Sequence, residues 1–231
     1  MQPSTALVVM AKQPLAGSTK TRLCPPFSPE QAAAFSEALL LDTFDLAGSL
    51  VGSLAGLQLA AAITPAASQP YFEKVSPPGT ILLAVDGADI GQCLSQSFEA
   101  LFQAGFKKVI ALNADGPSLP HPYLLQAIDL LDENDGVIGP GEDGGYYLVG
   151  LINPCPQLFQ DIEWSTPRVL EQTLARLHAL GLRTTLTPPW YDVDTVQEAQ
   201  RIFAELQQLP LDRLIHTRRF FENLQPGEWP I

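Results

Sequence analysis

Short apolar segments alternate along the chain with segments whose apolar residues recur at helical spacing. The short segments predict buried strands at positions 6–11, 57–64, 81–85, 109–113, 136–139, 146–151 and 183–186. The segments between them predict helices at positions 29–46, 90–104, 122–131, 167–180 and 196–206. A last amphipathic helix is predicted in the segment after Pro210.

This alternation is typical of a mostly parallel sheet with helices on both of its faces. We therefore predict an α/β protein with three layers, α/β/α, built on a mostly parallel mixed sheet. We expect residues 1–209 to form one domain, and residues 210–231 to form a helical tail packed on it. The first helix has a clear start signal, since Ser28 and Gln31 have the spacing of a capping box and Pro29 occupies the first helical position.

One uncharged segment, 46–63, approaches the length that spans a bilayer. Glycine, serine and glutamine interrupt it at several positions. The end of a helix, a loop and a buried strand explain this segment better than a membrane span.

Composition narrows the class of protein further. Hydrophobic residues make up 46% of the chain and charged residues 16%, which is typical of a globular protein. The formal net charge of −12 argues against binding to nucleic acids or anionic membranes, because both require a basic surface. The 3 cysteines predict no disulfide framework, and segment 6–11 is too short for a signal-peptide core. We expect a cytoplasmic protein.

The segment after the first predicted strand concentrates positive charge in this acidic chain. Lys12, Lys20 and Arg22 lie there, and Lys74 is the next basic residue along the chain. Gly17 lets the backbone approach a ligand, and the hydroxyls of Ser18, Thr19 and Thr21 are donors. Such a loop suits a phosphate chain, which arginine binds in a bidentate manner. The alternative is a solvated loop whose cations offset local acidity.

Asp115 follows the predicted strand at 109–113, and Gly116-Pro117 then stops the strand. Ligands bind at the carboxyl ends of strands in open sheets of this class. Beside bound phosphates, Asp115 would hold Mg²⁺ or Mn²⁺, since these hard cations prefer carboxylate oxygens. The alternative is an aspartate that only forms a turn.

A second acidic group, Asp192 and Asp194, precedes the helix predicted at 196–206. The two side chains point to the same side if this stretch is extended. One of them could complete a metal site with Asp115. Asp194 or Thr195 could instead supply a helix cap, and both roles can hold at once.

The segment 139–144 matches the glycine spacing of a dinucleotide-binding loop, G-x-G-x-x-G. That motif requires a helix after its third glycine, but the sequence that follows Gly145 is strand-like. We therefore reject a dinucleotide fingerprint. Two alternatives stay open: a ligand-facing loop in which Asp143 accepts hydrogen bonds from a sugar or acceptor, and a hairpin whose Asp-Gly turn needs only a positive φ.

Taken together, these motifs resemble a known family. AKQPLAGSTKTRL, NADGPSLP, GPGEDGGYYLVGL, LFQDIEWSTPRVLEQTL and DVDT are similar in content and order to the bacterial selenodomain-associated transferases, also labelled arsenosugar-biosynthesis glycosyltransferases. The resemblance extends from residue 11 to about residue 200. It implies the GT-A type of nucleotide-diphospho-sugar transferase fold. The first loop also resembles that of 2-phospholactate guanylyltransferase and, less closely, that of molybdenum cofactor guanylyltransferase.

The resemblance implies a role for each motif. The nucleotide phosphates would lie on Lys12, Gly17, Lys20, Thr21 and Arg22, the metal on Asp115 and either Asp192 or Asp194, and the acceptor or sugar on Asp143, Gly144 and Gly145, with Trp164, Ser165 and Thr166 closing one side. Two features depart from the family pattern. Asp115 is a single carboxylate where many GT-A enzymes have D-x-D, and no basic residue follows Asp89-Ile90-Gly91 closely.

The chemistry expected is metal-assisted transfer from a nucleotide or nucleotide-sugar donor to a small-molecule acceptor. Lys20, Arg22 and the cation bound by Asp115 would neutralise charge that develops on the phosphates. Glycosyl transfer is the first candidate, and nucleotidyl transfer with release of pyrophosphate is the alternative. A regulatory protein that binds nucleotide without catalysis is a third candidate. The sequence leaves the oligomeric state open, a homo-oligomer included.

Overall fold

The sheet is built outward from its first strand, β1 (Thr5–Lys12), which is paired on both sides. In the computed structural model, which describes residues 4–225, the strand order is β3-β2-β1-β4-β6-β5-β7. The other strands are β2 (Leu57–Thr64), β3 (Ile81–Ala84), β4 (Lys108–Asn113), β5 (Gly136–Pro140), β6 (Tyr146–Leu151) and β7 (Thr184–Leu186). β6 is antiparallel to both of its neighbours, whereas the remaining pairs are parallel. The predicted mostly parallel mixed sheet is confirmed.

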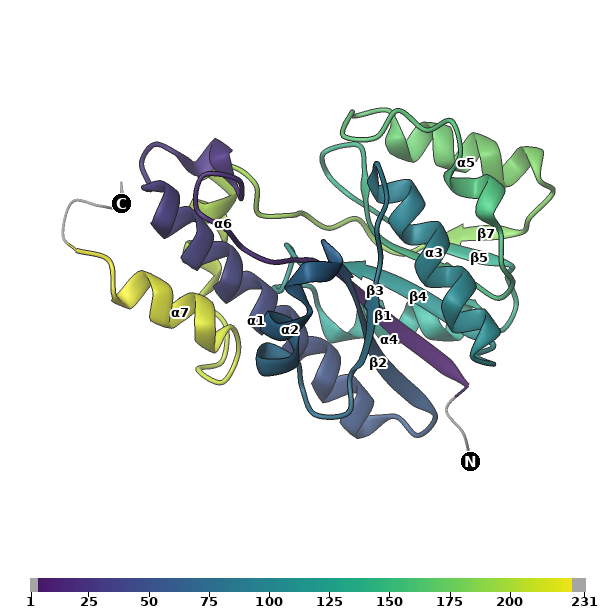
Figure 1. Cartoon of the computed structure of the whole chain (residues 1–231), viewed down its shortest axis with the longest axis horizontal. Coiled ribbons are helices and arrows are strands. Elements are labelled where there is room, and N and C mark those ends of the chain that lie inside the picture. Colours follow the sequence, from purple (N-terminus) through teal and green to yellow (C-terminus); the bar gives the residue numbers. More distant parts are fainter. Residues whose placement is uncertain (1–3, 226–231) are drawn as a thin grey trace.

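Helices cover both faces of this sheet (Figure 1). They are α1 (Pro29–Ser53), α2 (Gln69–Val75), α3 (Ile90–Gln103), α4 (His121–Leu130), α5 (Val169–Ala179), α6 (Val196–Glu205) and α7 (Ile215–Glu222), with short 3-10 turns η1 (Thr21–Leu23), η2 (Ala66–Ser68) and η3 (Pro156–Phe159). Leu7 and Val9 of β1 pack with α1 and α4 on one face, and Ala6 and Val8 pack with α3 and α5 on the other. Successive residues of a strand point to opposite faces, so β1 is apolar throughout because it is covered on both sides.

The first helix starts as predicted and ends later than predicted. Ser28 N–H donates to Gln31 Oε1 at 2.8 Å, and Gln31 N–H donates to Ser28 Oγ at 3.2 Å, which completes the capping box. Ala47 and Leu50 continue the buried face of the helix, so α1 extends to Ser53 rather than 46. The uncharged segment 46–63 is thus the end of α1, a loop and most of β2. Within residues 4–225, no helix has the length and apolar character needed to cross a membrane.

Sequence patterns miss α2, because this helix spans only 7 residues and Phe72 is its one buried side chain. The helix predicted at 167–180 begins later, at Val169. The other predicted elements agree with the structure to within a residue or two at each end.

A third apolar cluster joins the C-terminal segment to the start of the chain. Phe220 and Phe221 of α7 pack against Phe35 of α1, with ring centroids 4.9 and 5.3 Å from that of Phe35. Phe27, which follows η1, lies 5.3 Å from Phe220 in an edge-to-face arrangement. This cluster packs against η1 and so holds the end of the basic segment in place. A boundary at residue 209 stays a prediction.

Candidate nucleotide and acceptor site

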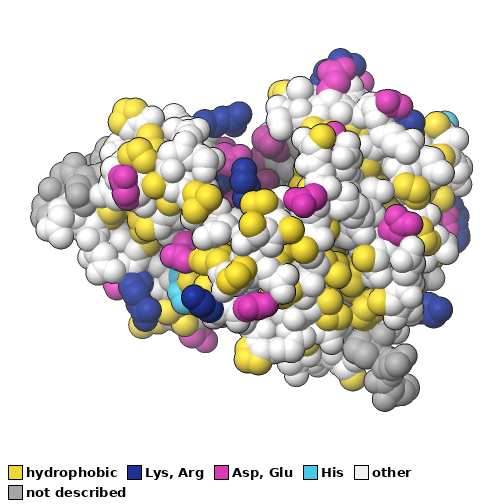
Figure 2. All heavy atoms as spheres, in the orientation of Figure 1, with side chains coloured by type: hydrophobic (Ala, Val, Ile, Leu, Met, Phe, Trp, Pro, Cys, Tyr) yellow, Lys and Arg dark blue, Asp and Glu magenta, His cyan; other side chains and the backbone are white. Residues whose placement is uncertain are grey.

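The candidate site lies where β1 and β4 end side by side. Met10 of β1 is in register with Asn113 of β4, so the segments that follow the two strands leave from one edge of the sheet. Val193 N–H donates to the carbonyl of Asp115 at 2.9 Å, which ties the stretch before α6 to the loop after β4. Figure 2 shows a hollow in the molecular surface at the top of this view, with acidic and basic side chains in its walls.

The segment after β1 folds into a compact turn before η1. Ser18 N–H and Thr19 N–H both donate to the carbonyl of Leu15, at 3.2 and 3.1 Å, and Leu15 N–H donates to Thr19 Oγ1 at 2.9 Å. Gly17 has φ +78°, a conformation that favours glycine, and within residues 4–225 no heavy atom beyond its chain neighbours lies within 4 Å of where its Cβ would be. Glycine is therefore needed at this position for the turn itself.

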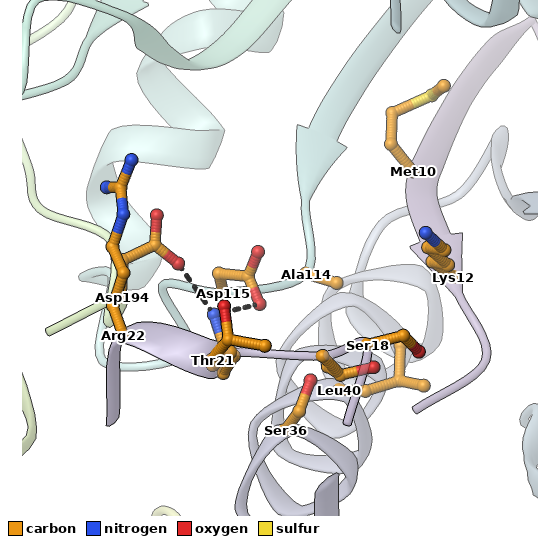
Figure 3. Close-up of a pocket in the computed structure, with 12 residues that line it drawn as sticks. Met10, Lys12, Ser18, Thr21, Arg22, Ser36, Leu40, Ala114, Asp115 and Asp194 are labelled. Atoms are coloured by element: carbon orange, nitrogen blue, oxygen red, sulfur yellow. Dashed lines mark hydrogen bonds and ion pairs between the residues drawn. The ribbon is translucent and has the colours of Figure 1, made fainter. Parts of the chain in front are cut away.

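A cavity of about 340 Å³ lies above this turn. Its lining includes Lys12, Ser18, Thr19, Lys20, Thr21, Arg22, Asp115 and Asp194, together with Met10 and, from α1, Ser36 and Leu40. Figure 3 shows the Arg22 guanidinium and the Lys12 ammonium on opposite sides of this space. Among residues 4–225, neither of these two cations has an ion-pair partner. They are therefore available to an anionic ligand.

Lys20 lines the first cavity and forms ion pairs with two carboxylates. Its ammonium lies 2.8 Å from Asp115 Oδ1 and 2.9 Å from Asp194 Oδ1 (dashed lines in Figure 3). Only 5% of the lysine side chain is exposed, against 40% for Asp115 and 48% for Asp194. Burial lowers the pKa of Lys20, but the two carboxylates outweigh this effect and raise the pKa above its ordinary value, so the ammonium stays charged.

Asp192 is separate from this ion-pair group. Its carboxylate is half-buried and accepts a hydrogen bond from the side-chain amide of Asn113. Burial, followed by the nearby charge of Asp115, raises the pKa of Asp192 to about 7, and the Asn113 hydrogen bond offsets part of this rise. Asp192 is thus poised to gain or lose a proton near neutral pH.

Thr195 occupies the cap position of α6, and Glu198 reaches back to the preceding backbone. The Glu198 carboxylate accepts from the N–H groups of Asp194 and Thr195 at 2.8 and 2.7 Å. Because the cap is provided by these residues, the Asp194 carboxylate is left to pair with Lys20. Thr195 is thus the helix cap, and a metal role for Asp194 stays a prediction.

A second cavity, of about 510 Å³, continues from the first. Met10, Arg22, Ala114, Asp115 and Asp194 line both cavities, and the second adds Asn113, Asp143, Gly145, Tyr146, Trp164, Ser165, Thr166 and Asp192 among others. Trp164 lies against the start of α3, where a Cβ on Gly91 would overlap its indole ring. Thr166 Oγ1 donates to the carbonyl of Glu163 at 2.7 Å and thereby closes a turn before α5.

The glycine-rich segment 139–145 is the turn of a hairpin. β5 and β6 are antiparallel, and no helix follows the third glycine, which confirms the rejection of a dinucleotide fingerprint. Gly144 has φ +89°, and a Cβ there would overlap the carbonyl oxygen of Pro167. The Asp143 carboxylate accepts from Gly145 N–H at 2.9 Å and also faces the second cavity. The hairpin is confirmed and requires Gly144, and a role of Asp143 in binding a sugar or acceptor stays a prediction.

The structure gathers most of the predicted site residues around two connected cavities. Gly17 and Gly144 are the exceptions, since neither is part of a cavity wall. The sequence interpretation missed Met10, Asn113 and Tyr146. Asn113 had a usable signal, because it is a polar residue at the end of a buried strand two positions before Asp115. Met10 and Tyr146 had no such signal, because each lies within a predicted strand and has no other distinguishing feature.

A different acidic group lies away from this site. Asp42, Asp45 and His216 bring ligand-type atoms within 4.8 Å of one another. Asp42 Oδ1 and Oδ2 already accept the N–H groups of His216 and Thr217, at 3.0 and 2.8 Å. Asp42 therefore acts on the first turn of α7 much as a cap would.

Comparison with solved structures places the fold among nucleotide-dependent transferases. A proposed nucleotide-diphospho-sugar transferase from Desulfovibrio desulfuricans G20 superposes with a TM-score of 0.83 at 26% identity, over 96% of each chain. CMP:2-keto-3-deoxy-manno-octonic acid synthetase, solved with CTP, gives 0.54 at 14% identity over 89% of this chain and 99% of that one. Rv0371c from Mycobacterium tuberculosis H37Rv, solved with manganese, gives 0.53 at 18% identity, over 88% of this chain and 100% of that one. The last two likenesses show the fold alone.

The fold is thus that of the nucleotide-diphospho-sugar transferases and related nucleotidyltransferases. A family model described as "Uncharacterized protein conserved in bacteria (DUF2064)" matches residues 49–166, and the chain belongs to this family. A comparison with curated proteins finds no match.

Proposed function

We propose that the protein is a transferase that takes a group from a nucleotide-activated donor and passes it to a small-molecule acceptor. The observation that carries this proposal is that Asp115 and Asp194 line both cavities. One cavity has the features of a phosphate site, and the other has the hydrogen-bonding groups of an acceptor site. A group that passes from one cavity to the other would pass these two carboxylates.

The donor phosphates are proposed to lie between Lys12 and Arg22, in the first cavity. Two cations without an ion-pair partner among residues 4–225 suit a chain of phosphates, because arginine can bind two oxygens of one phosphate and lysine acts as a point charge. Thr21 and Ser18 add hydroxyl donors to the same wall. The chain's net charge of −12 makes this local positive region the exception, which supports selective binding of an anion here.

Asp115 and Asp194 also fit a divalent cation. Asp115 and Asp194 both direct a carboxylate oxygen at one point, and that point already holds the positive charge of Lys20. We propose that Asp115 and Asp194 hold Mg²⁺ or Mn²⁺ when donor is bound, and the manganese in the Rv0371c structure supports this choice. A bound cation would neutralise charge on the donor phosphates as the leaving group departs.

The acceptor is proposed to occupy the second cavity. Asp143 and Asp192 would accept hydrogen bonds from its hydroxyl groups, and Trp164 would cover one side of it. Asp192 carries the raised pKa, to about 7, and faces this cavity. A carboxylate with a pKa near the working pH is suited to receive a proton from an attacking hydroxyl.

The group transferred is proposed to be a sugar, as the resemblance to the glycosyltransferases implies. Nucleotidyl transfer is the second candidate. It is favoured by the two unpaired cations, Lys12 and Arg22, which suit a triphosphate, and by the CTP complex of the synthetase that shares this fold. The two reactions differ in the product they release, a nucleoside diphosphate in the first case and pyrophosphate in the second.

A thermal-shift panel tests the proposal. Nucleoside triphosphates, diphosphates and nucleotide sugars are each added with Mn²⁺, with Mg²⁺ or with EDTA. A ligand at about 100 times its Kd adds about 2.7 kcal/mol, which corresponds to about 5–10 °C for a chain of this size. Release of pyrophosphate or of nucleoside diphosphate then identifies the reaction.

The matched controls are two aspartate variants. Asp115→Asn should abolish the metal-dependent part of the shift. Asp161→Asn changes an aspartate whose side chain is 87% exposed and should leave the shift intact. If no nucleotide raises the unfolding temperature with either metal, the proposed function is wrong.

A further inference from the structure

The ammonium of Lys20 occupies the point on which the Asp115 and Asp194 carboxylates converge. Each aspartate uses Oδ1 for this ion pair, and among residues 4–225 the Oδ2 atoms of both have no hydrogen-bond partner. The aspartates are 40% and 48% exposed, while Lys20 is 5% exposed. A cation that enters from solvent therefore meets free carboxylate oxygens before it meets the lysine.

The backbone at Lys20 is held in an uncommon conformation. Its φ is +48° and its ψ is 44°, in the left-handed region that non-glycine residues rarely adopt. Such conformations cost free energy and persist where the surrounding structure holds them, often at ligand clamps and switch regions. Here the conformation turns the chain so that the Lys20 side chain reaches Asp194, which is 174 positions away in the sequence.

From these observations we propose that Lys20 is an exchangeable counter-ion: it pairs with Asp115 and Asp194 and gives up this place to a divalent cation when donor phosphates bind. This inference rests on the proposed function, because it assigns the same site a metal and a nucleotide. It adds that the two ligands depend on each other. Neither should bind well alone.

The reason is electrostatic. Two carboxylates that converge on one point need a positive charge between them, and an ammonium and a divalent cation cannot both lie there because they repel each other. If the metal takes the position, the displaced ammonium needs another anion. The phosphate cavity is beside it, since Lys20 also lines that cavity together with Lys12 and Arg22. Donor phosphates thus supply the partner that Lys20 loses.

The same geometry admits a simpler role, in which Lys20 is a permanent structural ion pair. In that case the carboxylates would never be free, and removing the lysine would leave two uncompensated charges and destabilise the protein without creating a metal site. The exchange predicts tighter metal binding in a Lys20 variant, whereas the permanent ion pair predicts no change in metal affinity. The difference can be measured with the metal alone.

The experiment measures Mn²⁺ binding from the loss of the free-ion EPR signal, with the full chain and no nucleotide. We expect Lys20→Met to bind Mn²⁺ about tenfold more tightly than the wild type, within the usual range for coupled sites. Lys12→Met is the matched control, because it removes one positive charge from the same cavity but from no ion pair. Its Mn²⁺ affinity should stay within about twofold of the wild type, since the residue contacts neither carboxylate.

A second measurement uses the wild type alone and so does not depend on the folding of a variant. Its Mn²⁺ affinity should rise about tenfold when a saturating nucleoside diphosphate is added. An Mn²⁺ affinity that is the same in Lys20→Met, Lys12→Met and the wild type overturns the exchange, as does a wild-type affinity that no nucleoside phosphate changes. If the thermal-shift panel nevertheless detects joint binding of nucleotide and metal, the proposed function survives and only the role of Lys20 is wrong.

Discussion

Arg201 of α6 and Glu142 of the β5–β6 turn form an ion pair of 2.7 Å. The same guanidinium lies over the ring of Tyr191, with its central carbon 3.7 Å from the ring centroid. Glu142 precedes Asp143, and Tyr191 precedes Asp192. One arginine outside the two cavities therefore contacts the neighbours of two acidic residues that line the second cavity.

We expect Arg201→Met to destabilise the protein by about 1–2 kcal/mol, the sum of two partly exposed ion pairs, to Glu142 and Glu205, and a cation–π contact. Urea unfolding measures the change. Arg168→Met is the control, because among residues 4–225 Arg168 has Glu163 as its one ion-pair partner and its side chain is 59% exposed. Its expected cost is below about 0.5 kcal/mol. Equal losses in the two variants would show that the Tyr191 contact contributes nothing.

Asp192 should make the stability of the metal-free protein depend on pH. Its pKa is about 7 in the folded protein against 3.8 in the unfolded chain, so the folded state binds more protons between these values. The contribution of Asp192 to stability is then largest below about pH 4, and it falls as pH rises toward 7. Above pH 7 the contribution of this group is constant.

The measurement is thermal unfolding from pH 5 to pH 8, in EDTA, for the wild type and Asp192→Asn. We expect the variant to gain stability relative to the wild type as pH rises, by an amount on the order of a few kcal/mol at pH 8. Parallel pH profiles for the two proteins would contradict the raised pKa of Asp192.

Gly144→Ala should be one of the most damaging single substitutions in the turn. The residue has φ +89°, and the new Cβ would overlap the carbonyl oxygen of Pro167. Left-handed strain and overpacking together should cost about 3 kcal/mol or more. Gly17→Ala is the matched control, since Gly17 has φ +78° and open space around its Cβ position, so only the strain of about 1–2 kcal/mol applies. Chemical denaturation of both variants measures the difference, and equal costs would argue against the close contact with Pro167.

Asp42→Ala should loosen α7 from α1. The substitution removes the acceptor of two N–H groups at the start of α7, which we expect to cost about 1–3 kcal/mol. Asp45→Ala, at a side chain that is 60% exposed, should cost less than about 0.5 kcal/mol. Hydrogen exchange of the α7 amides reports the local effect. Unchanged exchange in Asp42→Ala would show that the aromatic cluster alone holds α7.

Local sequence patterns account for much of the architecture. The capping box at Ser28 and Gln31 and the apolar segments that became β1, β2, β4 and β6 are visible without any tertiary information, because they depend on neighbours only a few positions apart. The length of α1 was harder to predict from the sequence, because Ala47 and Leu50 continue the helix by packing on the sheet. α2 was missed because one buried phenylalanine makes no periodic pattern.

By itself, the sequence determined the α/β class, the rejection of a dinucleotide-binding loop at segment 139–144 and which residues are candidates for the site. Only the tertiary structure decided how these residues are paired: Lys20 with Asp115 and Asp194, Asp192 with Asn113, and Glu198 at the start of α6. The reason is physical. Helix and strand signals arise from short-range periodicity and steric preference, whereas the partner of a buried charge depends on which strand ends the sheet brings together, and Lys20 meets Asp194 across 174 positions of chain.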